Sequence, residues 1–139
     1  MTLQEIIQTL KAIALTQPGI RSANDGDIYD ALNGNTNVKY GVFHINQTTH
    51  QTTEDTDTYG LNLFYVDRLE ADDANRLQVQ SIGKTVLDNI IMAFCNACDI
   101  DVPTVTYTPF TQKFTDMTAG VFATVNFTTF KEWSCPEWQ

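Results

Sequence analysis

Basic residues are scarce in this chain. Eight lysines and arginines stand against 17 aspartates and glutamates, which gives a formal net charge of −9. A protein that grips DNA or RNA neutralises phosphates with lysine and arginine, so this balance argues against a nucleic-acid-binding protein. The same charge disfavours attachment to anionic membranes. It is compatible with solubility, with basic protein partners, or with a surface that DNA passes without adhering.

Long apolar runs and cysteines are also few. No apolar run approaches the roughly 18 residues that a membrane span needs. The first residues lack the basic and apolar regions of a signal peptide, so we expect synthesis and folding in a cytosol. The chain has three cysteines. An odd number in a protein without an export signal does not indicate a disulfide framework, and we expect none.

The residues best suited to chemistry do not combine into a catalytic or metal site. Cys95 and Cys98 form a CxxC pair, but at the end of a predicted helix, where the dipole opposes a thiolate. Zinc needs four ligands, and only Cys135, His44 and His50 remain to complete a set. We therefore predict structural thiols, no metal, no cofactor and no catalytic residue.

The pattern of apolar residues predicts a single α+β domain spanning residues 1–139. A capping box from Thr2 to Glu5 begins a helix that Pro18 and Gly19 end, and residues 22–26 are expected to form a loop. The element order is α-β-β-α-β-β, which indicates a mainly antiparallel sheet with helices packed on one face. Strands are predicted at residues 38–46, 59–67, 104–110 and 119–130, where Pro109 indicates an edge strand or a strand end. The main helix is expected from a cap at Asp72 to about residue 97, with Val79, Ile82, Val86, Ile90, Ala93 and Ala97 on its buried stripe.

Two segments have no place in this core. Residues 47–58 contain no apolar side chain and predict a polar hairpin arm or loop, and long loops in compact domains are often functional. The short tail at residues 131–139 carries two tryptophans, and large aromatics outside a core often anchor interfaces. The candidate partner-contact residues are Glu54, Asp55, Asp57, Trp133 and Trp138.

Roughly residues 60 to 128 carry a resemblance to a known group of proteins. The stretch Leu63-Phe64-Tyr65-Val66-Asp67-Arg68-Leu69 is followed by Asn75, Gln80-Ser81-Ile82-Gly83 and Asn89-Ile90-Ile91, then by Pro109-Phe110-Thr111-Gln112-Lys113-Phe114-Thr115-Asp116 and Ala119-Gly120-Val121-Phe122-Ala123. This pattern resembles small neck and tail proteins of tailed phages that infect Bacteroides-type hosts, such as the crass-like phages.

The resemblance implies a tail-terminator-like fold that builds rings of six or twelve copies. Such rings form the head-to-tail connector under the portal and join it to the tail of the virion, which assembles in the host cytoplasm. The expected partners are copies of the chain itself, the portal and other neck or tail proteins, with neither a membrane nor specific nucleic-acid binding. DNA would pass through the lumen, and we expect loop acids to face it: Glu54, Asp55 and Asp57, or Asp99 and Asp101.

Two other functions stay open on the sequence alone. One is a small thiol- or metal-dependent enzyme that uses Cys95, Cys98 and His44. The other is a monomeric phage-encoded binding module.

Overall fold

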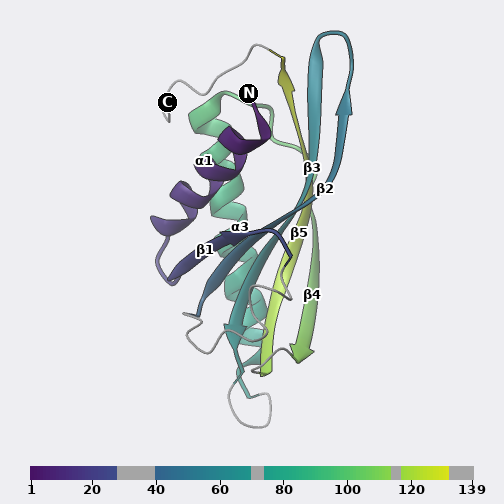
Figure 1. Ribbon diagram of the computed structural model, residues 1–139. Helices are drawn as coiled ribbons and strands as arrows, with labels where there is room; N and C mark the ends of the chain where they lie inside the picture. The colour runs from purple at the N-terminus through teal and green to yellow at the C-terminus, as the bar shows by residue number, and fades with distance from the viewer. Residues whose placement is uncertain (28–39, 70–73, 114–116, 132–139) are drawn as a thin grey trace.

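The computed structural model describes residues 1–27, 40–69, 74–113 and 117–131 (Figure 1). Within these residues, two helices pack against a five-strand, mostly antiparallel sheet, which confirms the predicted α+β class. The elements are α1 (Leu3–Leu15), β1 (Ser22–Asp25), β2 (Val42–Thr52), β3 (Thr56–Arg68), α3 (Arg76–Cys98), β4 (Thr106–Lys113) and β5 (Met117–Phe130).

The sheet contains one strand that the sequence did not predict. Its order is β1-β2-β3-β5-β4, and β1 runs parallel to β2 with Ser22 opposite Val42. The expectation of a loop at residues 22–26 was therefore wrong, and the order is α-β-β-β-α-β-β. Asn and Asp are depleted in strands, so local composition hides β1, and pairing with the edge of β2 creates it.

Several element boundaries also differ from prediction. The polar residues 47–58 form the end of a β-hairpin, because β2 and β3 both continue into this segment. The main helix begins at Arg76, and Asn75 occupies its N-cap position without a capping side-chain bond. The predicted cap Asp72 lies outside the described residues.

The helices begin and pack for identifiable reasons. The Glu5 N–H donates to the Thr2 hydroxyl at 3.1 Å and the Thr2 N–H to the Glu5 carboxylate at 3.2 Å, so the predicted capping box is present. On α3, Val79, Val86 and Ile90 are buried as predicted, but Ile82 is 44% exposed. Gly83 faces the sheet in its place, where a larger residue would collide with β3 and β5.

The two faces of the sheet differ. The face toward the helices carries the main core. Successive side chains of each strand point alternately to this face and to the opposite one. The opposite face holds the buried pair Val42 and Val66 and three aromatic rings in mutual contact, those of Phe64, Phe110 and Phe122. Pro109 lies in the edge strand β4, where a missing N–H is tolerated, as its position in the sequence predicted.

Candidate functional site

The polar hairpin projects at one end of the sheet (Figure 1). It is built from β2 and β3, and β5 accompanies it, with Thr58 opposite Thr128 and Thr56 opposite Phe130. A hydrogen bond between the hydroxyls of Thr53 and Thr56, at 2.7 Å, closes the turn. The hairpin thus has a defined conformation while its side chains remain largely in solvent.

The three acids predicted for this segment have different surroundings. Glu54 and Asp55 lie exposed in the turn. Asp57 instead accepts a 3.2 Å hydrogen bond from His50, whose ring stacks on Tyr59 at 4.5 Å. Hydrogen bonds from Thr52 and His50 lower the pKa of Asp57. The structure therefore leaves Glu54 and Asp55 available to a partner and engages Asp57 within the chain.

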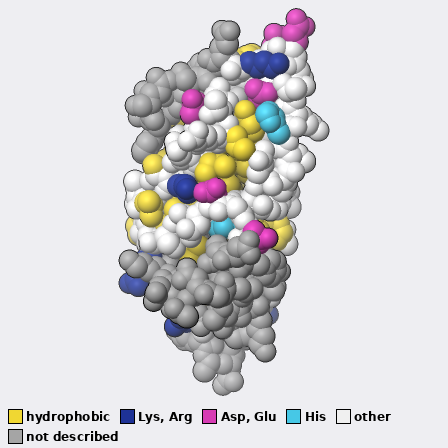
Figure 2. All heavy atoms as spheres, viewed as in Figure 1, with side chains coloured by type: hydrophobic (Ala, Val, Ile, Leu, Met, Phe, Trp, Pro, Cys, Tyr) yellow, Lys and Arg dark blue, Asp and Glu magenta, His cyan; other side chains and the backbone are white. Residues whose placement is uncertain are grey.

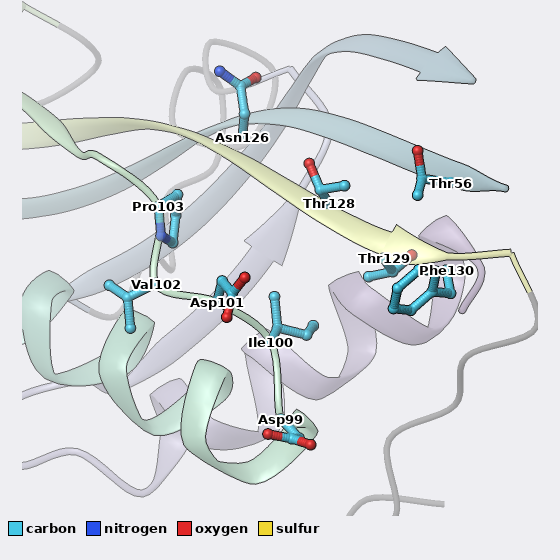
Figure 3. Close-up of a pocket in the computed structure, with 10 residues that line it drawn as sticks. All are labelled: Thr56, Asp99, Ile100, Asp101, Val102, Pro103, Asn126, Thr128, Thr129 and Phe130. Atoms are coloured by element: carbon cyan, nitrogen blue, oxygen red, sulfur yellow. The ribbon is translucent and has the colours of Figure 1, made fainter. Parts of the chain in front are cut away.

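A groove lies beside the far end of β5. The strand β4 pairs with β5 only as far as Thr124, so residues 125–130 have β3 on one side and no strand on the other among the described residues. The connection after α3, residues 99–103, forms the opposite wall (Figure 3). The space between them measures about 550 Å³. Ligand clefts commonly measure roughly 300 to 1,000 Å³.

Polar and apolar groups line this groove together. Asn126 and Thr128 point to one side of β5, and Thr129 lies on the side toward the helices (Figure 3). The Thr129 hydroxyl is buried and has no hydrogen-bond partner in the structure. Val102 and Phe130 are 50% and 67% exposed. Such a mixture of apolar surface and unsatisfied polar groups is typical of a surface that contacts something else.

Two carboxylates stand on the connection, one on each side of Ile100 (Figure 3). Neither Asp99 nor Asp101 forms an ion pair within the described part of the chain. Asp99 also has a left-handed backbone, with φ of 53°, at the C-terminus of α3. A negative charge there opposes the helix dipole, so the carboxylate of Asp99 does not stabilise its own helix.

The residues of the thiol-enzyme alternative do not meet. Cys95 lies in the core between α3 and the sheet, where burial raises the pKa of its thiol to about 11. His44 is on the opposite face of the sheet, beside Phe64. Cys98 is in a disulfide, whereas Cys95 is free. The expectation of no disulfide was therefore wrong, because spacing along the chain does not reveal which thiols fold together.

His44 is nevertheless an unusual residue. Its side chain is fully buried, and its Nε2 is 2.8 Å from the carbonyl oxygen of Gly26. Since a carbonyl only accepts, Nε2 donates, and Nδ1 keeps a lone pair that no donor meets. Burial lowers the pKa of His44 and holds the imidazole neutral.

Basic side chains do not gather into a patch on the face of the molecule in Figure 2. Lys11 is 2.8 Å from Asp25, and Lys84 lies over the ring of Tyr107. Within the described ranges, no group of three or more metal-binding side chains is present. No helix in the described chain is long and apolar enough to cross a membrane.

The predicted contact residues Trp133 and Trp138 lie outside the described residues. The sequence identified Asp99 and Asp101 as loop acids but did not place them beside Thr129. The alternation of apolar and polar residues along β5 also does not show that the end of this strand lacks a neighbouring strand. The comparisons add no relative: no family model matches this chain, and no curated protein matches it.

Proposed function

We propose that this chain is a structural subunit that forms an oligomeric ring in the head-to-tail connector of a tailed phage, joining portal to tail. The observation that carries the proposal is the projecting hairpin. Its strands are well paired, yet from Gln47 to Asp55 every side chain is exposed. A chain that keeps such a hairpin ordered without burying it in its own core is suited to bury it against a neighbour. The resemblance over residues 60 to 128 supports the same assignment.

A contact between the hairpin of one copy and a different surface of the next copy can repeat around a ring. A hairpin that meets a different surface on the next copy makes a head-to-tail contact, and repeated rotation closes a ring. Each contact can be weak, because closure adds the contacts together. We therefore expect the free subunit to remain monomeric until a portal template is present. Glu54 and Asp55, exposed in the turn, are the acids assigned to the neighbour.

Electron microscopy of intact particles tests this assignment directly. Density for this chain in the neck, in multiple copies, is the expected result. Particles that lack the chain in neck and tail would contradict the proposal, and would favour the monomeric binding module.

A charge reversal tests the role of the hairpin separately. Because the Glu54 side chain is exposed, Glu54→Lys should leave the thermal midpoint within a few degrees of wild type. It should reduce incorporation into particles, because it reverses a charge at the proposed contact with the neighbouring subunit. The matched control is Gln4→Lys with Gln8→Lys, which adds the same charge on exposed positions of α1. Equal loss in both proteins would assign the effect to charge alone. The wholesale removal of residues 49–57 is a poorer test, since it also removes the partners of Thr129 and Phe130.

A further inference from the structure

We propose that the groove beside residues 125–130 is an acceptor for an extended, lysine- or arginine-bearing segment of another protein, which adds to the sheet as a strand next to β5. This inference does not depend on the ring. It concerns a second surface, at the opposite edge of the sheet from β1.

The free edge of β5 supplies the main attraction. Beyond Thr124 the strand has lost its neighbour β4, so its outward N–H and C=O groups have no strand partner among the described residues. Unpaired strand edges are templates for another chain, and peptide recognition by strand addition uses them. Here the edge is not open to every chain, because the connection at residues 99–103 confines the space to a groove of about 550 Å³.

The lining of the groove indicates what it accepts. The Thr129 hydroxyl, on a side chain only 4% exposed, has no hydrogen-bond partner, so the end of β5 is not fully satisfied by its own chain. Val102 and Phe130 offer apolar surface at the same place. Alternate side chains of an added strand point to opposite faces, so one set can meet apolar groups while the other stays polar.

Charge decides between a second copy and a different protein. Asp99 and Asp101 stand on the groove wall without a cationic partner in the described chain. The extended segment that a second copy offers most readily is the hairpin, whose turn carries Glu54 and Asp55 and would be repelled. A segment with lysine or arginine fits instead. The position of Asp99, unfavourable for its own helix, agrees with a role toward a partner.

The test is a titration of the full chain, labelled for NMR, with three blocked peptides. The first is Thr-Lys-Val-Thr-Val-Lys-Thr. The second replaces both lysines by glutamate, and the third keeps the lysines but replaces both valines by proline, which removes strand N–H donors. We expect the first peptide to shift amide signals of residues 125–130 and 99–103, and to bind more tightly than the other two.

Substitutions locate the contact. Asp99→Asn with Asp101→Asn should lower the affinity for the first peptide by about two- to tenfold, which is the range expected for exposed ion pairs. The matched control, Glu54→Gln with Asp55→Asn, removes the same charge from the hairpin turn and should not alter binding. Thr129→Val keeps the shape and removes the unsatisfied hydroxyl, so it should raise the thermal midpoint.

Three results would overturn the proposal. The groove amides could remain unshifted at millimolar peptide. The proline peptide could bind as well as the first, which would reduce the effect to bulk electrostatics. The signals of residues 125–130 could shift with protein concentration alone, which would assign the groove to a second copy. None of these depends on whether the chain appears in the neck of particles, so this test and that of the ring fail independently.

Discussion

A neutral imidazole inside the sheet makes His44 a source of pH-dependent stability. Its Nε2 is bonded to Gly26 and its Nδ1 is unpartnered, so a second proton would be buried without a hydrogen-bond acceptor. Asp25 and Asp27 favour the charged form, but burial is the larger effect and the pKa of His44 is lowered. The folded protein therefore holds a proton at this ring less readily than the unfolded chain does.

The sign of the pH dependence follows from this difference. The contribution of His44 is fully present above its unfolded pKa, about 6.5, and is lost progressively as the pH falls below that value. Urea unfolding from about pH 7.5 down to about pH 5.5 should show a falling free energy of unfolding. His44→Gln, which keeps a donor for Gly26, should flatten this fall. Parallel profiles for the two proteins would contradict the assignment.

At the scale of the elements, close packing of α3 on the sheet depends on Gly83. A Cβ at this position would lie 2.7 Å from Cδ1 of Tyr65 and 2.8 Å from Cγ1 of Val121. Gly83→Ala gains up to about 1 kcal/mol of helix propensity. Overpacking typically costs about 1 to 3 kcal/mol, so we expect a net loss of about 1 kcal/mol in the free energy of unfolding.

Denaturant unfolding checks this expectation, with Ser81→Ala as a control at an exposed position of the same helix. The control should change stability by a few tenths of a kcal/mol. A stabilised Gly83→Ala protein would show that Tyr65 and Val121 can move aside.

Gly83 also shows where sequence reasoning reaches its limit. Helical periodicity predicted both helices, because their apolar stripes repeat every three or four residues. It assigned Ile82 to the buried stripe and did not assign Gly83, since hydrophobicity carries no information about how closely a backbone must approach a sheet. The strand β1 was missed for a related reason: four mostly polar residues become a strand only through their neighbour β2.

The groove was not predictable from the sequence because it arises from an offset between two strands. Nothing local to β4 or β5 indicates that β4 pairs only as far as Thr124 while β5 continues to Phe130. The loop acids Asp99 and Asp101 could be named from the sequence, but their neighbours across the groove lie some distance along the chain. Local sequence patterns therefore predict the helix and sheet layers and some of the groove residues. The position of the groove depends on how the strands pair in the folded chain, which local patterns do not reveal.

At the scale of the whole molecule, a disulfide holds Cys98, the last residue of α3. Loss of a native disulfide in a small domain typically costs about 2 to 5 kcal/mol. Cys98→Ala should lower the free energy of unfolding by about this amount without reductant, and the difference from wild type should shrink with excess reductant.

Cys95→Ala separates packing from cross-linking, because Cys95 is buried and free. It removes a side chain from the core but leaves the disulfide intact, so its cost should not depend on reductant. Equal effects of reductant on the Cys95 and Cys98 variants would contradict a structural disulfide.

The charge of the whole chain predicts how it behaves toward DNA. With a net charge of −9, the surface repels phosphates over roughly 8 to 10 Å at moderate salt. Three of the described cations are engaged within the chain: Lys11 pairs with Asp25, and Lys84 and Arg68 lie over tyrosine rings. A wall of this kind would let DNA slide through a ring, whereas a cationic wall would hold phosphates by counterion release.

We therefore expect no retention of duplex DNA by micromolar protein in a mobility-shift assay, even at about 50 mM salt, where such contacts are strongest. The assay should be repeated with assembled particles or rings, because assembly could concentrate charges that are separate in one subunit. Tight binding that weakens as salt rises would contradict the prediction. So would a map of the ring in which Lys39, Lys84 and Lys113 line the lumen.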